Sequence, residues 1–217
     1  MISIEPLGDR AYLAHLPDER LAAGWAGGLR RLGWEGVTDV VLAYRSVAVF
    51  ADPDRLDLEE LGARLRMVEV PASGPIASGR LVEVPVRYDG EDLQEVADRT
   101  GLTPEAVIAM HSGTTYDVFA IGFLPGFPYA GYLPDRLSGL ARRESPRVRV
   151  PAGSVAIAGR QTGIYPGESP GGWHLLGRTP IRLVDLEAGV FTIRAGDWIR
   201  FHPIPTETFE VRLHDHP

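Results

Sequence analysis

The first seventy residues alternate β-type runs with amphipathic segments. Residues 10–16, 37–43 and 47–51 are rich in aliphatic side chains, which is typical of short strands. Large apolar residues recur every three or four positions over 21–32, and a second such stripe covers 57–67. We expect an order of roughly ββαββα over the first seventy residues, which predicts a small α+β domain of two layers.

A segment of small residues follows this first pattern. Residues 71–79 are rich in proline, glycine and serine and carry no periodicity, which is typical of a linker. We therefore expect two domains. The first is a small α+β domain over 1–72, and the second covers 80–217.

The second domain is predicted to begin with a strand and two short helices. Valines alternate over 81–88, and Pro85 within this run favours an edge strand or a bulge. A helix over 91–99 is followed by one that begins at Thr103, an N-cap residue before a proline, and ends near His111.

Beyond residue 115 the pattern predicts short strands and no helix. Glycine and proline turns separate these runs, and such a series indicates a barrel or a sandwich. The expected strands are 116–121, 154–158, 181–185, 190–194, 197–202 and 208–213.

Composition excludes several kinds of chemistry. The 217 residues include no cysteine, no lysine and no asparagine. Thiolate catalysis, cysteine-ligated metals, Schiff bases and a Walker A loop are therefore excluded. The six histidines are dispersed, so no metal site is predicted.

The net charge and the lengths of the apolar runs indicate which partners and which location to expect. The net charge of −7 argues against a nucleic-acid partner and against a polybasic membrane surface. No apolar run approaches the ~18 residues of a membrane-spanning helix, and the N-terminal segment lacks the pattern of a signal peptide. We therefore expect a cytoplasmic protein that does not bind membranes.

Glycine and proline are concentrated between residues 113 and 180, which hold 12 of the 25 glycines and 8 of the 18 prolines. Residues 118–134 carry no charge. Three segments are distinctive: GFLPGFPYAGYLP (122–134), PRVRVPAGSVAIAGRQTGIYP (146–166) and SPGGWHLLGRTP (169–180). They form either turns between barrel strands or the walls of a ligand site, and we expect them to converge on one concave site.

These segments carry a resemblance to a known family. Together with HSGTTYDVFAIGF (111–123), PLGDRA (6–11) and AGDWIRFHPI (195–204), they resemble the family of the 5-oxoprolinase B subunit. The same family is described as sporulation-kinase inhibitor KipI and as allophanate hydrolase subunit 1. The resemblance implies a small N-terminal α/β domain and a C-terminal cyclophilin-like β-barrel that carries the signature loops.

The resemblance implies one subunit of an ATP-dependent 5-oxoprolinase, which opens 5-oxoproline to glutamate. ATP with Mg is expected to bind together with a partner, and the expected partners are the C-type and A-type subunits of the same enzyme. The chain alone is expected to be inactive, because it shows no nucleophile beside a base and no P-loop lysine.

Two alternatives remain open. One is a protein that inhibits a sporulation histidine kinase through an exposed apolar patch. The other is a component of a urea carboxylase or allophanate hydrolase system. That component would carry no biotin, because biotin attachment requires a lysine and the chain has none.

Four polar residues are candidates for catalysis or substrate binding. His111 is the candidate proton-transfer group, or else a residue that interacts with its helix end. The carboxamide of Gln161 suits a lactam ligand, or else stabilises a turn. Arg147 and Arg178 are candidate clamps for a carboxylate or phosphate, or else ordinary ion-pair partners.

Tyrosines and glycines complete the predicted substrate site. The hydroxyls of Tyr129 and Tyr165 are expected to position the ligand, or else the two rings cap the barrel. The paired Gly171 and Gly172 allow backbone N–H groups to converge on an anion.

Three further aromatic residues are candidates for the partner interface, because aromatic side chains carry much of the binding energy at such surfaces. They are Phe127, Tyr132 and Trp173.

Overall fold

The computed structural model describes residues 2–69 and 79–215. The chain divides into two compact units, residues 1–79 and 80–217. The expected linker over 71–79 lies, except for Gly79, outside the described residues.

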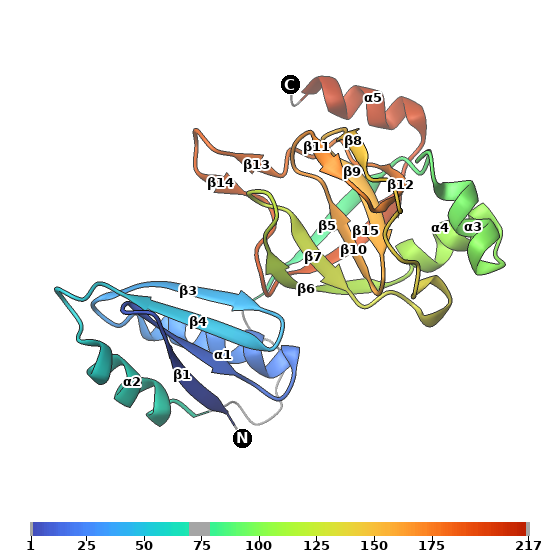
Figure 1. Ribbon diagram of the computed structural model, residues 1–217. Helices are drawn as coiled ribbons and strands as arrows, with labels where there is room; N and C mark the ends of the chain where they lie inside the picture. Colours follow the sequence, from blue (N-terminus) through green and yellow to red (C-terminus); the bar gives the residue numbers. More distant parts are fainter. Residues whose placement is uncertain (1, 70–78, 216–217) are drawn as a thin grey trace. The chain divides into compact units, whose positions relative to one another are not determined.

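The first unit is a four-stranded antiparallel sheet with two helices, in strand order β1-β2-β4-β3 (Figure 1). The predicted order ββαββα is confirmed. The elements are β1 (Ser3–Leu7), β2 (Ala11–His15), α1 (Glu19–Leu32), β3 (Val37–Ala43), β4 (Ser46–Ala51) and α2 (Leu58–Met67).

Local sequence explains where these two helices begin and end. The Asp18 carboxylate accepts a hydrogen bond from the Leu21 amide at 2.8 Å and so caps α1, and Gly33 ends this helix in the left-handed conformation. Asp57 caps α2 in the same way. The apolar stripe of α1 faces the sheet and buries Trp25 almost completely.

The second unit is built on a sheet in the order β5-β15-β6-β7-β10-β9-β12. All neighbours are antiparallel except β5 and β15, which run parallel. The strands are β5 (Leu81–Val86), β15 (Trp198–Pro203), β6 (Thr115–Ile121), β7 (Pro128–Gly131), β10 (Gln161–Ile164), β9 (Ser154–Ala158) and β12 (His174–Arg178).

The two outer strands of this sheet approach each other at one point. Among the described strands β5 pairs with β15 alone, so the edge position predicted from Pro85 is confirmed. Just beyond β5, Arg87 forms an isolated antiparallel bridge with Arg178 at the end of β12. The two N–H···O distances of this bridge are 2.9 and 2.8 Å.

Helices and two small sheets surround the main sheet. The helices predicted over 91–99 and from Thr103 are confirmed, and Thr103 accepts a hydrogen bond from the Ala106 amide. None of the described helices is long and apolar enough to cross a membrane. The remaining elements are α3 (Leu93–Thr100), α4 (Pro104–Ser112), η1 (Asp135–Leu137), β8 (Arg147–Val150) with β11 (Ser169–Gly171), β13 (Val184–Asp185) with β14 (Val190–Phe191), and α5 (Thr206–Asp215).

The strand predicted over 208–213 is wrong, because this segment lies in α5. Its alternating Phe209 and Val211 imitate a strand pattern, but Phe209 is buried whereas Val211 is exposed. Phe209 anchors the helix, since the Arg87 guanidinium lies 4.2 Å from the centre of its ring. The expectation of no helix beyond residue 115 is therefore also wrong.

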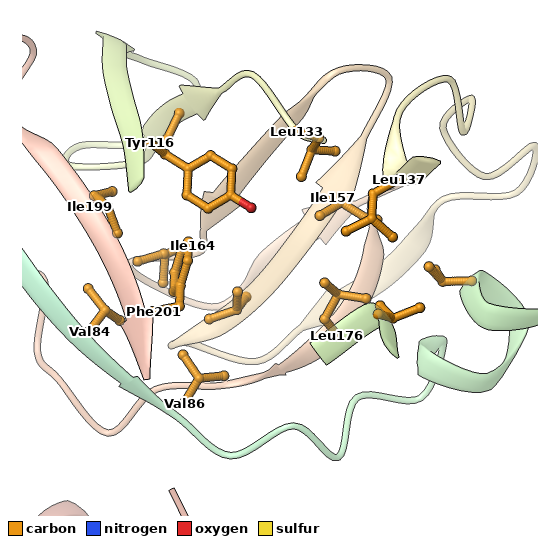
Figure 2. Close-up of a cluster of buried hydrophobic side chains, with 14 of the residues drawn as sticks. Val84, Val86, Tyr116, Leu133, Leu137, Ile157, Ile164, Leu176, Ile199 and Phe201 are labelled. Atoms are coloured by element: carbon orange, nitrogen blue, oxygen red, sulfur yellow. The ribbon is translucent and has the colours of Figure 1, made fainter. Parts of the chain in front are cut away.

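The core of the second unit lies on the inner face of the main sheet. Figure 2 shows Val84, Tyr116, Leu176 and Phe201 among the side chains that gather there. In β9 the alternation is clear, because Ile157 joins this core whereas Ala156 belongs to a cluster on the opposite face. The mixed α+β class predicted from the sequence is confirmed.

Replacing Gly177 with alanine tests the contact between the outer strands. An added Cβ would lie 2.3 Å from the carbonyl oxygen of Arg87 and 2.9 Å from the Cα of Tyr88, and backbone atoms cannot turn away. We expect Gly177→Ala to lower the free energy of unfolding of the second unit by about 1–3 kcal/mol in urea titrations. Gly167→Ala is the control, since nothing lies within 4 Å of its added Cβ. Equal stability of the two variants would contradict the packing described here.

Candidate functional site

The three glycine- and proline-rich segments meet on the outer face of the main sheet. Strands β7, β10, β9 and β12 all come from these segments and lie next to one another. The predicted convergence is therefore confirmed, whereas the concave shape of the site stays a prediction. The buried residues of this outer cluster are Phe127, Val150, Ala156, Ala158, Tyr165, Trp173 and Leu175.

Aromatic rings hold the outer cluster together. The Phe127 ring makes edge contacts with Tyr165 and Trp173, with centroids 5.2 and 5.5 Å apart, and Tyr129 contacts Trp173 at 5.8 Å. Phe127 and Trp173 are buried, which argues against their expected role as exposed anchors for a partner. Tyr132 is 38% exposed, and the Arg160 guanidinium lies 4.0 Å from its ring centre.

Gln161 and Tyr129 lie on this same outer face. Gln161 pairs with Gly131 across the β10–β7 ladder, two residues beyond Tyr129. Both side chains are half-buried. Small residues lie beside them, since Ala158 is the register partner of Gln161 in β9. The register therefore places an amide and a phenol on the same face of the sheet, and both groups can hydrogen-bond a polar ligand.

A buried carboxylate fixes the loops around this face. Asp92 is 2% exposed and accepts hydrogen bonds from Arg143 Nη1 at 2.8 Å, from Arg147 Nη2 at 2.6 Å and from the Leu175 amide at 2.7 Å. Burial alone would raise the pKa of Asp92, but these hydrogen bonds and the two positive charges hold it below its usual value. Asp92 is therefore ionised and fully bonded at neutral pH.

The two predicted arginine clamps have partners within the chain. Arg147 pairs with Asp92 and Glu91, which is the ion-pair alternative considered for it. Its Nη1 is nevertheless buried without a hydrogen-bond acceptor in the described structure. Arg178 donates from Nε to the Ala152 carbonyl at 2.7 Å. The structure thus brings Arg147 to the outer face as part of a network and ties Arg178 to a turn.

His111 lies in the inner core rather than on this face. It is fully buried, stacks on Phe201 at 4.4 Å, and has hydrogen-bond contacts with the Tyr88 hydroxyl at 2.7 Å and the Thr162 hydroxyl at 2.8 Å. Burial lowers its pKa to about 3, so the ring is neutral. This environment favours a structural role, and the proton-transfer role stays a prediction.

The paired glycines lie at the edge of the outer cluster. Gly171 is the register partner of Arg147 in the β11–β8 ladder, and the Gly172 carbonyl accepts a hydrogen bond from the Arg143 amide at 2.8 Å. Only glycine fits at 171, because an added Cβ would lie 2.3 Å from the Tyr165 hydroxyl. The structure therefore brings Tyr165 and both glycines together.

Several residues of this network were not predicted from the sequence. Asp92, Arg143 and His174 were not singled out. His174 is fully buried and its Nε2 contacts the Ala141 carbonyl at 2.9 Å, while its Nδ1 has no hydrogen-bond partner among the described groups. The one available signal was the position of His174 beside Trp173 within a predicted site segment.

A separate hollow lies on the first unit. It has a volume of about 650 Å³, is open to solvent and was not predicted from the sequence. The residues around the hollow are Arg10, Thr38, Asp39, Val41, Phe50, Ala51, Asp52 and Pro53.

Among all the side chains that the structure describes, no group of three or more histidines and carboxylates could hold a metal ion.

Comparison with known proteins agrees with this fold. Residues 2–192 match the model of the carboxyltransferase domain, subdomain C and D, which gives the class of the protein. The chain is also 39% identical to the 5-oxoprolinase B subunit of Haemophilus influenzae in an alignment of 208 residues that covers 92% of this chain and 97% of the relative. It therefore belongs to the family of the 5-oxoprolinase B subunit.

Solved structures show the same fold within longer chains. The crystal structure of TTHA0988 is 40% identical with a TM-score of 0.79, over 94% of this chain and 40% of that one. K. lactis urea amidolyase has a TM-score of 0.71 over 99% of this chain and 15% of its own. Its identity is 18%, so that likeness concerns the fold alone.

The neutral state of His111 predicts a pH dependence of stability. An unfolded histidine titrates near ~6.5, so below this pH the unfolded chain binds a proton that folded His111 excludes. This group should therefore remove about 2 kcal/mol from the free energy of unfolding of the second unit between pH 7 and 5. Urea titrations should show a shallower pH slope for His111→Gln than for the wild type. The same slope in wild type and His111→Gln would show that the ring is charged in the folded protein.

Proposed function

We propose that this chain is one of the subunits of an ATP-dependent 5-oxoprolinase, which opens the lactam of 5-oxoproline to glutamate. The observation that carries the proposal is the likeness over nearly the whole chain to a relative named as the B subunit of 5-oxoprolinase. The outer face of the second unit supports it, because the polar groups there suit the two functional groups of this substrate.

5-Oxoproline presents a lactam and a carboxylate. The Gln161 carboxamide both donates and accepts hydrogen bonds, as a lactam does, and the Tyr129 hydroxyl lies on the same face. Arginines near Gly171 provide the positive charge that a carboxylate requires. We therefore assign substrate binding to this outer face. Arg147 and Arg178 mainly hold the surrounding segments in place, through Asp92 and the Ala152 carbonyl respectively.

The chemistry explains why ATP is needed. A lactam is stabilised by resonance, and transfer of a phosphoryl group to its oxygen makes the carbon electrophilic. Water then adds to this carbon and the C–N bond breaks, which frees the amine and leaves an acyl phosphate. A second water hydrolyses the acyl phosphate to the carboxylate of glutamate and inorganic phosphate. Because the chain has no lysine for a P-loop, we assign ATP and Mg binding to a site shared with a partner chain.

We also infer that partner chains complete the enzyme. The name of the relative, which marks it as one of several subunits, supports this, and so does TTHA0988, in which the matching region is only 40% of a longer chain. We propose the C-type and A-type subunits of the same enzyme as the partners, acting in the cytoplasm. Exposed Tyr132 is the remaining candidate from the predicted interface residues.

The shape of the main sheet and a second candidate function are further proposals. We propose that the main sheet closes as a cyclophilin-like barrel, which the Arg87–Arg178 bridge between its outer strands supports. A role in a urea carboxylase or allophanate hydrolase system is the second candidate, because the K. lactis enzyme shares the fold.

Reconstitution with the two partner chains tests the function. We expect ATP-dependent release of glutamate from 5-oxoproline by the assembled chains and none from this chain alone. Gln161→Ala should lower the rate at least about tenfold, because it removes a hydrogen-bonding group from the substrate face. Gln94→Ala is a matched control, since Gln94 is the other glutamine of the chain and bonds Asp98 on the surface of α3.

Robust turnover by the isolated chain would overturn the need for partners. Full activity of Gln161→Ala in the assembled enzyme would overturn the assignment of the substrate face. Absence of any complex would favour the inhibitor of a sporulation histidine kinase.

A further inference from the structure

The turn between β11 and β12 is flanked by three arginines. Gly171 pairs with Arg147 in the small sheet of β8 and β11, which lie side by side in Figure 1. The Arg143 amide donates to the Gly172 carbonyl at 2.8 Å, and this bond places Arg142 one residue away from the same turn. Positive groups therefore reach the turn from two separate segments of the chain.

Arg142 differs from its two neighbours in its contacts. Arg143 bonds Asp92 and Glu95, and Arg147 bonds Asp92 and Glu91. Arg142 is exposed and pairs with no carboxylate in the described part of the chain. The carboxylates of Glu91, Asp92 and Glu95 are engaged by Arg143 and Arg147. Because no ion pair among the described residues engages Arg142, its charge is available to a ligand.

The Tyr165 hydroxyl lies at the base of this turn. An added Cβ on Gly171 would come within 2.3 Å of this hydroxyl, so the backbone passes directly over it. Burial raises the pKa of Tyr165, while a backbone hydrogen bond from Trp173 and the charges of Arg142 and Arg147 oppose the rise. The hydroxyl is therefore protonated at neutral pH, and two guanidinium groups lie within electrostatic reach of it.

Arg147, the register partner of Gly171, has one donor without an acceptor among the described groups. Its Nη1 is buried and has no acceptor in the described structure, although its Nη2 and Nε bond Asp92 and Glu91. Buried donors nearly always have acceptors in native proteins. A negatively charged group bound at the turn would be stabilised by the field of this guanidinium without displacing Asp92.

We propose that Arg142, the Gly171–Gly172 turn and the Tyr165 hydroxyl form a binding site for an oxyanion, either a carboxylate or a phosphate group. Resting on the proposed function, the site takes the carboxylate of 5-oxoproline or a phosphate of the nucleotide. Arg142 supplies the charge, the glycines allow close approach of the backbone, and Tyr165 supplies a hydroxyl donor.

Titrations followed by amide NMR test this site. The signals of Gly171, Gly172 and Trp173 are read while the chain is titrated with 5-oxoproline, with inorganic phosphate, or with 2-pyrrolidone, which is the same lactam without a carboxylate. We expect one or both anions to shift these signals and 2-pyrrolidone to leave them unchanged. Arg142→Gln should raise the dissociation constant at least tenfold. Arg149→Gln should not, because Arg149 is already paired with Glu168 through two hydrogen bonds.

The outcomes separate the two sources of the anion and the two proposals. Shifts with 5-oxoproline identify a substrate carboxylate, whereas shifts with phosphate alone identify a phosphate site. Absence of shifts with both anions, or equal binding by wild type and Arg142→Gln, overturns the oxyanion site. Anion binding at this turn in a protein whose assembled complex releases no glutamate would overturn the proposed function and leave the site standing.

Discussion

The candidate site depends on one buried carboxylate. Asp92 lies immediately before α3, and its two oxygens bond Arg143, Arg147 and the Leu175 amide. Each of these partners belongs to a different segment, so one side chain holds together a helix, a loop and two strands. Removing one partner of a buried ion pair typically costs about 3–5 kcal/mol, because the remaining charge stays buried without compensation. No other described polar group of the second unit joins so many separate segments of the outer face.

This network divides the arginines by role. Arg143 and Arg147 are committed to Asp92, and a guanidinium held in this way stabilises the fold instead of closing on a ligand. Arg142 follows the same loop but has no such partner among the described residues, so the loop presents its charge outward. In the inner core His111 also has a structural environment, because its ring is neutral and has hydrogen-bond contacts with Tyr88 and Thr162. Residues with similar chemistry in the sequence thus separate into structural and ligand-facing groups only after folding.

The sequence predicts the first unit well because local interactions determine it. The stripes of α1 and α2 and their caps at Asp18 and Asp57 lie within a few residues of each other. The second unit is predicted less well. Its short strands β7, β10 and β12 contain glycine and depend on distant partners. The segment of α5 resembles a strand because Phe209 and Val211 alternate with polar residues, although Phe209 is buried and Val211 is exposed.

The candidate site follows the same rule. Its three segments are visible in the sequence from their composition, and the structure brings them together. Which arginine is free is not visible, because Asp92 lies 51 residues from Arg143 and 55 from Arg147. Such long-range pairing leaves no periodic pattern, and Asp92 itself looks like an ordinary acidic residue at the start of a helix.

Amide hydrogen exchange in Asp92→Asn measures the role of this carboxylate most directly. The variant keeps the size of the side chain and removes its charge, so the Arg143 and Arg147 guanidiniums lose their buried counterion. We predict that the Arg143 and Leu175 amides lose protection by at least about 100-fold, which corresponds to the lower end of the cost of breaking a buried pair. The amides shared by β5 and β15 should keep their protection. Wild-type protection of Arg143 and Leu175 in Asp92→Asn would contradict the central place given to this carboxylate.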